Sequence, residues 1–218
     1  MHHRTTLPQG EAPQTAGKLI RWARYYDAVS WLLSFGQIGR IRRLIIEAAE
    51  PAPGEKVLDV GCGTGTLAIA AKAKAGPAGE VQGIDASPEM IQVARRKAAR
   101  AGADVGFQVG LIEELPFDGG RFDLVTSTMM LHHLPEDLKR KGLAEVRRVL
   151  KPESRLLVVD FASQPQSFVG LLASLLPGHG RDHSGAARIK AMLVDAGFGD
   201  VEQLPTKYRQ LMFVRARP

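Results

Sequence analysis

The chain has 218 residues, enough for one well-buried α/β domain but not for two full domains. Its 29 basic and 23 acidic residues give a formal charge of +6, which favours anionic partners but does not decide the fold. The only cysteine, Cys62, excludes a disulfide within the chain and a metal site built from several cysteines.

The N-terminal region predicts a loose tail followed by two helices. Residues 1–17 are polar, contain Pro and Gly and carry no recognisable secretory signal, so we expect a cytoplasmic protein. Residues 18–35 repeat apolar side chains at spacings of three and four, which is typical of a helix with one apolar face. A second helix is expected over about 40–49.

From residue 51 onward, short apolar runs alternate with helical segments. The expected strands are 56–60, 80–85, 105–109, 122–127 and 155–161, and the expected helices are 66–76, 87–102 and 135–150. This alternation predicts βαβ units and therefore a Rossmann-like three-layer sandwich, with helices on both faces of a mostly parallel sheet. Residues 18–50 would form a helical cap beside this single domain of residues 51–218.

The C-terminal part predicts a different connection. A helix is expected near 185–196, followed by apolar runs at 200–204 and 208–216. Only a few residues around Pro205 separate the two runs, which leaves no room for a crossover helix. The last two of the seven strands should therefore form an antiparallel hairpin at the edge of the sheet.

The sequence VLDVGCGTG, residues 57–65, places one acid and three glycines around the end of the first strand. Glycines let the backbone approach a ligand closely and adopt positive φ. The spacing is G-x-G-x-G followed by Thr66, whereas a dinucleotide fingerprint is G-x-G-x-x-G. Asp59, ahead of the loop, would repel a pyrophosphate but suits a ligand that carries an ammonium group.

A second acid ends the next predicted strand. Asp85 follows Gly65 by 20 residues in the sequence GIDAS, where a carboxylate can accept hydrogen bonds from both hydroxyls of a ribose. A nucleoside that carries an amino acid fits both acids and the glycine loop.

Four segments together resemble the class I S-adenosylmethionine-dependent methyltransferases. They are VLDVGCGTG, GIDASPEM, EELPFDGGRFDLV, and LHHLPE with EVRRVLKP. They are most similar to the branch that includes the quinone-ring (UbiE-like) and small bacterial phospholipid N-methyltransferases, over about Tyr26 to Phe161. The resemblance implies S-adenosyl-L-methionine as cofactor, S-adenosyl-L-homocysteine as product, and a methyltransferase domain over residues 51–218.

The resemblance also implies which residues surround the cofactor. The first strand and the glycine loop would hold the methionine part, Asp85 the ribose, and the segment after the third strand the adenine. Two residues after the fourth strand would border the methionine end. The full set is Asp59, Gly61, Cys62, Gly63, Thr64, Gly65, Asp85, Ala86, Ser87, Met90, Leu111, Ile112, Glu113, Ser127 and Thr128.

Two positions depart from the family pattern. The family has glycine, aspartate and alanine after the third strand, and the aspartate bonds the adenine amino group; here Leu111 replaces it and cannot accept that bond. The backbone, Glu113 or water would replace the bond, or apolar packing would hold the adenine. A glycine pair before the fifth strand is replaced by Glu153 and Ser154, for which we expect only a changed turn.

A base is needed only if the acceptor carries a proton, because a sulfonium methyl group is already activated. His132 and His133 follow the fourth strand, and Asp160 ends the fifth. Adjacent residues on a helix point apart, so at most one histidine should face the pocket. His133 and Asp160 are the candidates, although His133 could instead support the loop and Asp160 could cap the next helix. By resemblance, Tyr26 lies near the sulfonium, where its ring attracts positive charge.

No metal is expected. The loop 177–185 contains His179, Asp182 and His183, but it is better explained as a lid or a substrate contact.

The expected acceptor is a small, hydrophobic molecule such as a quinone. The alternative enzyme is a phospholipid N-methyltransferase that contacts the membrane surface through residues 18–35, whose aromatic and basic side chains suit an interfacial helix. Packing of their apolar side chains on the domain is the simpler explanation and is favoured. From another class, a cofactor-binding protein without turnover remains open. The sequence contains no RNA-binding motif, so no nucleic-acid partner is expected.

Overall fold

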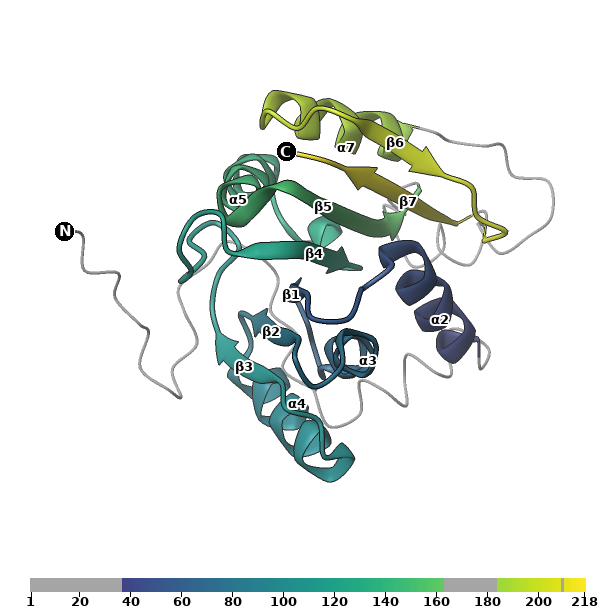
Figure 1. Cartoon of the computed structure of the whole chain (residues 1–218). Coiled ribbons are helices and arrows are strands. Elements are labelled where there is room, and N and C mark those ends of the chain that lie inside the picture. Colours follow the sequence, from purple (N-terminus) through teal and green to yellow (C-terminus); the bar gives the residue numbers. More distant parts are fainter. Residues whose placement is uncertain (1–36, 163–183, 209) are drawn as a thin grey trace.

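The computed structural model describes residues 37–162, 184–208 and 210–218, and Figure 1 shows their arrangement. The strands are β1 (Lys56–Val60), β2 (Glu80–Asp85), β3 (Gly106–Val109), β4 (Phe122–Thr128), β5 (Leu150–Phe161), β6 (Val201–Leu204) and β7 (Leu211–Ala216). The helices are α2 (Ile38–Ala49), α3 (Thr66–Ala75), α4 (Pro88–Ala101), the one-turn 3₁₀ helix η1 (Leu131–His133), α5 (Glu136–Val149) and α7 (Ser184–Asp195).

The seven strands form one sheet in the order β3-β2-β1-β4-β5-β7-β6. Strands β1 to β5 pair in parallel, and β7 is antiparallel to both of its neighbours. The chain adds β2 and β3 on one side of β1, then β4 and β5 on the other side. The order therefore reverses between β1 and β4, and ligands of open α/β sheets bind beyond the carboxyl ends of the strands at such a point.

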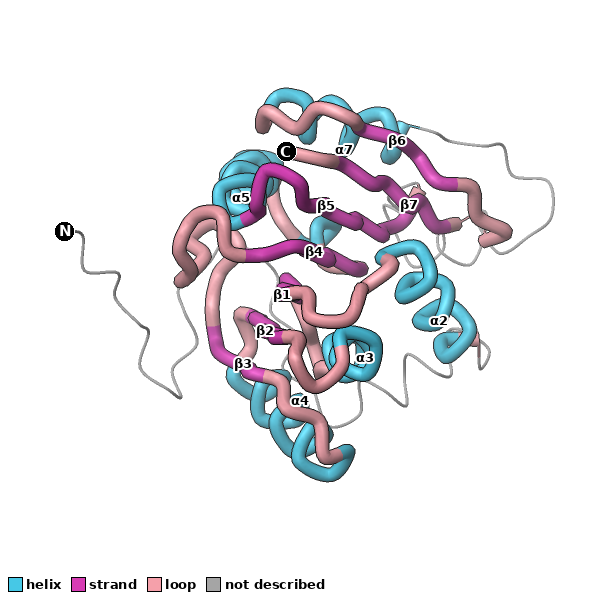
Figure 2. The backbone as a smooth tube through the Cα atoms, in the orientation of Figure 1, coloured by secondary structure: helices cyan, strands magenta, loops and turns pink. Residues whose placement is uncertain are grey.

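Helices cover both faces of the sheet (Figure 2). Val57 and Leu157 pack in the core beneath α2, α3 and α4, whereas Leu58 and Leu156 pack in the core beneath α5 and α7. Neighbouring residues of one strand thus enter opposite cores, which explains why these strands read as continuous apolar runs. The predicted three-layer sandwich and its C-terminal hairpin are confirmed, with β6 at the edge of the sheet.

The start of α4 follows its sequence signals. Ser87 is the N-cap, and its hydroxyl accepts a hydrogen bond from the backbone N–H of Met90 at 3.2 Å. Pro88 occupies the first helical position, Glu89 lies in the first turn, and Gly102 ends the helix in the left-handed conformation.

One strand is longer than predicted. β5 begins at Leu150, directly after α5, and not at residue 155. Its pairing with β4 jumps from Leu150 opposite Phe122 to Arg155 opposite Leu124, so residues between them form an irregular stretch. The buried Ser154 donates its hydroxyl to the carbonyl of Lys151 and closes this stretch, which is the local change of turn expected from the missing glycines.

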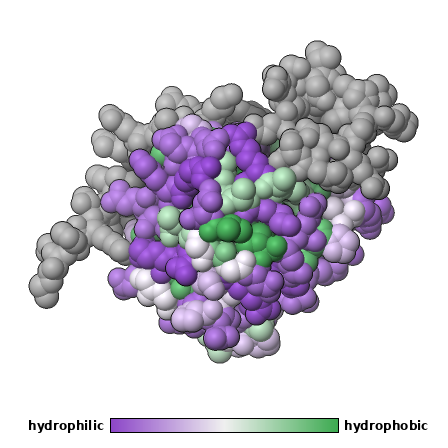
Figure 3. Space-filling model, turned by 90° about the horizontal axis from the view of Figure 1, so that it is seen from above, coloured by the Kyte–Doolittle hydropathy of each residue, from purple (hydrophilic) through white to green (hydrophobic). Residues whose placement is uncertain are grey.

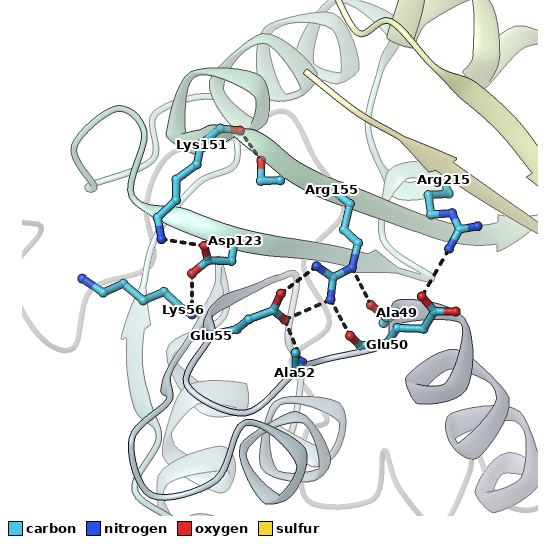
Figure 4. Close-up of polar contacts among 10 residues, drawn as sticks. Ala49, Glu50, Ala52, Glu55, Lys56, Asp123, Lys151, Arg155 and Arg215 are labelled. Atoms are coloured by element: carbon cyan, nitrogen blue, oxygen red, sulfur yellow. Dashed lines mark hydrogen bonds and ion pairs between the residues drawn. The ribbon is translucent and has the colours of Figure 1, made fainter.

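Arg155 connects the end of helix α2 to the sheet (Figure 4). This contact lies at the amino ends of the parallel strands, away from their carboxyl ends. Its guanidinium donates to the carbonyls of Ala49 (2.9 Å) and Glu50 (2.5 Å) at the end of α2, and to both carboxylate oxygens of Glu55 (2.8 and 2.9 Å). Glu55 in turn accepts from the backbone N–H of Ala52. The last carbonyls of the helix are therefore satisfied by a forked, charge-assisted set of bonds, which is stronger than ordinary surface pairing.

The surface on the side of α7 and β6 is mostly hydrophilic, with one hydrophobic patch near its middle (Figure 3). Among the described residues, Val194 of α7 is the one large hydrophobic residue that is exposed. Within the same residues, no helix combines the length and apolar character needed to cross a bilayer. The predicted helix 18–35, including Tyr26, and the residues His179, Asp182 and His183 lie outside the described residues.

Candidate functional site

The glycine loop folds back over the end of β2. The backbone N–H groups of Gly61 and Cys62 both donate to the carbonyl of Ile84, at 2.9 and 2.8 Å, and Gly65 donates to Cys62 at 2.9 Å. These bonds bring the loop and the end of β2 together at the reversal of strand order. Gly61, the first residue of the loop, follows β1 directly, so the predicted loop lies at the edge of the sheet where α/β proteins bind ligands.

The glycines of this loop serve two different needs. A Cβ on Gly61 would overlap the side chain of Met130, and one on Gly65 would lie 2.6 Å from Cζ of Phe107. These two positions therefore permit close packing. A Cβ on Gly63, at φ +53°, would meet no atom of the described residues within 4 Å, so this part of the loop has room for a ligand close to its backbone.

Alanine substitutions should separate these two needs. Gly65→Ala forces a Cβ against Phe107 and Ala94 at φ +74°, and should lower the free energy of unfolding by about 2–4 kcal/mol. Gly63→Ala adds only about 1–2 kcal/mol of backbone strain, but should weaken binding of S-adenosylhomocysteine at least about tenfold by filling the open space. Urea unfolding and calorimetric titration measure the two effects. Equal losses of stability, or parental affinity in Gly63→Ala, would contradict this assignment.

Asp59 is buried at the end of β1 beneath the loop. Its Oδ1 accepts a hydrogen bond from the hydroxyl of Thr126 on β4 at 2.7 Å. Burial raises the pKa of this carboxyl to about 7; the Thr126 bond opposes the rise and the charge of Asp85 adds to it. A buried carboxylate of this kind favours a cationic neighbour.

Two buried polar atoms at this edge have no hydrogen-bond partner within the described residues. They are Oδ2 of Asp59 and the hydroxyl of Ser127, which lies on β4 opposite Val60 of β1. Buried polar atoms are nearly always paired in folded proteins, so each of these two unpaired groups at the strand ends suits a polar ligand. The ammonium and carboxylate of an amino acid match the chemistry of these two groups.

Asp85 connects the glycine loop to helix α4. Its Oδ2 accepts from the backbone N–H of Gly63 at 2.8 Å, and its Oδ1 accepts from that of Ser87 at 2.9 Å. Burial raises the pKa of this carboxyl, and the two backbone bonds act in the opposite direction. Each carboxylate oxygen has a second lone pair, so both can still accept a hydroxyl of a ribose.

Three predicted residues are committed to other contacts. The side chain of Ile112 is buried in the core beneath α5, where it contacts Gly142, so only its backbone remains for a ligand. The hydroxyl of Ser87 accepts from Met90 and donates to Glu89 at 2.8 Å, which makes it a helix cap. Burial raises the pKa of the Cys62 thiol, so this residue is a packing group and not a nucleophile.

The remaining predicted residues surround these groups. Leu111 forms an isolated bridge with Glu114 directly after β3, beside Asp85, whose carbonyl accepts from Gly110 at 3.1 Å. Ala86, Glu113 and Thr128 are half-buried, Thr64 is buried, and Met90 is buried at the start of α4.

Lys97 of α4 was not predicted as part of the site. Its ammonium donates to the hydroxyls of Thr64, at 3.0 Å, and Thr66, and so fixes the glycine loop from the helix side. The sequence gives no signal for this role, because Lys97 is one of several basic residues on the same helix.

The segment after β4 turns sharply before η1. The backbone N–H of Met129 still donates to Val159 of β5 at 2.8 Å, but Met129 has φ +53°, which strains a residue that is not glycine. The next residue, Met130, packs its side chain against Gly61. The strained turn thereby places η1 beside the glycine loop.

In η1 the residue that contacts Asp160 is His132, whereas the sequence analysis favoured His133. Oδ1 of Asp160 lies 2.7 Å from Nδ1 of His132, and its Oδ2 accepts from the backbone N–H of His132 at 3.0 Å. Asp160 is buried, and His132 is about one-fifth exposed. The His133 ring packs on the His132 ring at 3.9 Å between centroids. The histidine that contacts Asp160 is therefore His132, which the sequence analysis did not select.

The structure thus places a glycine loop and two buried acids at the ligand-binding edge of an α/β sheet. Comparisons with known proteins identify the class of protein. Residues 57–153 match the family described as "Methyltransferase domain". The structure superposes on a SAM-dependent methyltransferase from Aquifex aeolicus with a TM-score of 0.63 and 23% identity, over 80% of this chain and 88% of that one. The protein is accordingly a class I S-adenosylmethionine-dependent methyltransferase.

Proteins of similar sequence identify the family within this class. A demethylmenaquinone methyltransferase from Thermus thermophilus is 39% identical over 147 residues, or 67% of this chain and 66% of that protein. A ubiquinone/menaquinone biosynthesis C-methyltransferase UbiE from Shewanella sediminis is 30% identical over 92% of this chain and 88% of that protein. The chain belongs to the UbiE-like family of these methyltransferases, and its cofactor is S-adenosylmethionine. These relatives give no support to the phospholipid alternative.

Proposed function

We propose that this enzyme methylates a ring carbon of a small, hydrophobic quinol. The acceptor follows from the two relatives above, whose names specify quinone substrates. The reduced form is proposed because a hydroquinone ring is electron-rich and nucleophilic, whereas a quinone ring is electrophilic. When bound, S-adenosylmethionine supplies a methyl group on a positively charged sulfur that needs no further activation.

We propose that different residues at the carboxyl ends of the strands bind different parts of the cofactor. Asp59 would face the ammonium of the cofactor, Ser127 its carboxylate, and Asp85 its ribose hydroxyls. The observation that supports this best is the buried Oδ2 of Asp59, which has no partner within the described residues and lies at the end of the strand that leads into the glycine loop. Main-chain groups after β3, around Leu111, would contact the adenine, since Leu111 offers no polar side chain.

The residues outside the cofactor site would position the acceptor and exclude water, which supplies much of the rate in methyl transfer. The predicted contact of Tyr26 with the sulfonium and the predicted membrane contact of residues 18–35 remain proposals. A membrane contact would suit an acceptor with a long apolar tail.

The test uses cofactor labelled on the transferable methyl group and a demethylmenaquinone with a short isoprenoid chain, reduced under anaerobic conditions. We expect enzyme-dependent label on a ring carbon, identified by mass spectrometry, and little with the oxidised quinone. The same assay is repeated with a cell lysate in place of the quinol. If label appears in another organic-soluble compound of the lysate and none appears in the quinol, that compound and not the quinol is the acceptor. Tight cofactor binding without transfer to quinol, organic extract or aqueous fraction would support a binding protein without turnover.

A further inference from the structure

We infer that His132 is the base that removes a proton from the acceptor, and that Asp160 positions it. The inference rests on the proposed function, because a base is required only for an acceptor such as a phenol. It differs from the expectation that His133 fills this role.

The ring of His132 is held from three directions. Asp160 contacts Nδ1 at 2.7 Å, the Phe161 ring meets it edge-on with centroids 5.0 Å apart, and the His133 ring packs against it. A second oxygen of Asp160 accepts the backbone N–H of the same histidine at 3.0 Å, so the carboxylate fixes both the ring and its main chain. This leaves little freedom for the imidazole to rotate.

The hydrogen bond to Asp160 determines which nitrogen carries the proton. An ionised carboxylate only accepts hydrogen bonds, and Asp160 already accepts from the backbone N–H of Phe161 at 2.8 Å and from that of His132. Nδ1 of His132 must therefore be the protonated nitrogen, and Nε2 presents a lone pair. No described residue forms a hydrogen bond with Nε2, and the ring is partly exposed at the edge where β4 and β5 end.

Other titratable groups lie close to the pair. The ammonium of Lys139 on α5 is buried near Asp160; burial and Arg188 lower its pKa, whereas Asp160 and Glu136 raise it. The other titratable side chain that meets His132 among the described residues is His133, through ring packing.

The chemical step balances with one base. Nε2 of His132 takes the proton of a hydroxyl on the acceptor, and the electron pair of the O–H bond remains on the oxygen and delocalises into the ring. The ring carbon forms the new bond to the methyl carbon, and the pair of the broken carbon–sulfur bond stays on sulfur. The ring carbon then loses its own proton to water and regains aromaticity, and the ring oxygen takes back the proton held by Nε2 of His132.

Kinetics with the reduced demethylmenaquinone distinguish the two histidines. We expect His132→Gln and Asp160→Asn to lower kcat by roughly 10²–10⁴-fold with small changes in the affinity for S-adenosylhomocysteine. His133→Gln, which removes one of the contacts that hold the His132 ring, should lower kcat by at most about tenfold. The control variant Asp104→Asn, at an exposed acid before β3, should keep the kcat of the parent. The defect of His132→Gln should shrink as the pH rises and the quinol ionises by itself, a rescue that a purely structural role would not give. Equal losses in both histidine variants would overturn the inference.

A second measurement does not depend on turnover. Nitrogen-15 NMR of the ligand-free protein with labelled histidine should show His132 with its proton on Nδ1. Asp160→Asn, whose amide can donate to Nδ1, should shift the proton to Nε2. A parental His132 with its proton on Nε2, or a spectrum unchanged by Asp160→Asn, refutes the pair. If the parent transfers no methyl group to the quinol, the proposed function fails, while the spectra still decide whether the pair exists.

Discussion

Asp59→Asn should weaken binding of S-adenosylhomocysteine at pH 8 by about 2–4 kcal/mol, or roughly 30- to 1000-fold. The substitution keeps the shape of the side chain but removes the buried negative charge that we place opposite the ammonium of the ligand. Oδ2 of Asp59 is buried and has no partner within the described residues, so no other group of the described protein replaces that contact. Calorimetric titration gives the affinity directly.

The affinity of the parent should also depend on pH in a defined way. Burial raises the pKa of Asp59 to about 7 in the ligand-free protein. A bound ammonium favours the carboxylate, so the ligand can bind below pH 7 only if this proton is released. Affinity should therefore fall by up to about tenfold per pH unit between pH 7 and pH 5.5. It should fall again at alkaline pH, where the amino group of the free ligand loses its proton.

Two variants control this experiment. Asp59→Asn should remove the fall in affinity at acidic pH and keep the fall at alkaline pH. Asp123→Asn should change neither, because Asp123 lies at the other end of the sheet, where it accepts from the backbone of Lys56 and from Lys151. Asp85 also has a raised pKa, so if affinity still falls at acidic pH in Asp59→Asn, the titrating group is Asp85. A parental profile that is flat from pH 5.5 to 7.5 would refute the contact with Asp59.

The same carboxylate should destabilise the ligand-free fold at high pH. Between pH 4 and 7 the folded protein holds a proton that the unfolded chain has released, so the free energy of unfolding falls as the pH rises through this range. A rise of the pKa from 3.8 to about 7 corresponds to roughly 4 kcal/mol above pH 7. Asp59→Asn should thus be more stable than the parent by roughly 3–4 kcal/mol at pH 8, and by less than about half of that at pH 5. Urea unfolding at both pH values measures this difference.

The sequence predicted the fold because its signals are local and agree with one another. The apolar runs, the spacing of the helices and the Ser87-Pro88 start of α4 all favour the same βαβ arrangement. β5 was predicted too short because its first residues follow α5 without any turn signal. Their irregular pairing is stabilised by a hydrogen bond between Ser154 and Lys151, which the pattern of apolar residues in the sequence does not predict.

The cofactor side of the site was accessible from sequence for a similar reason. Asp59, the glycine loop and Asp85 lie at strand ends, where the chain order alone brings them together. The choice between His132 and His133 was not accessible. Adjacent residues of a three-residue 3₁₀ helix differ only in direction, and that direction follows from the strained turn at Met129 and the bond to Asp160. The core position of the Ile112 side chain was also not accessible, because an apolar side chain fits either an adenine or a core, and its close contact is with Gly142, 30 residues later in the chain.

Asp85→Ala should reduce the affinity for S-adenosylhomocysteine by roughly 10²-fold or more, because a carboxylate that accepts two hydroxyls contributes about 1.5–3 kcal/mol for each bond. The variant also removes the acceptor of the backbone N–H groups of Gly63 and Ser87, so part of the loss would come from the loop itself. Affinity for one ligand therefore cannot separate the two effects.

A double-mutant cycle with a ligand change isolates the ribose contact. The parent should bind S-adenosylhomocysteine about 10- to 100-fold more tightly than its 2′-deoxy analogue, since the analogue lacks one donor to Asp85. Asp85→Ala should bind the two ligands almost equally, although more weakly than the parent binds either, because the loop is no longer held. Asp104→Asn, a change of an exposed acid before β3, should keep the full preference of the parent. If Asp85→Ala retains that preference, another group binds the ribose, and the carboxylate of Asp85 serves only to hold the glycine loop on α4.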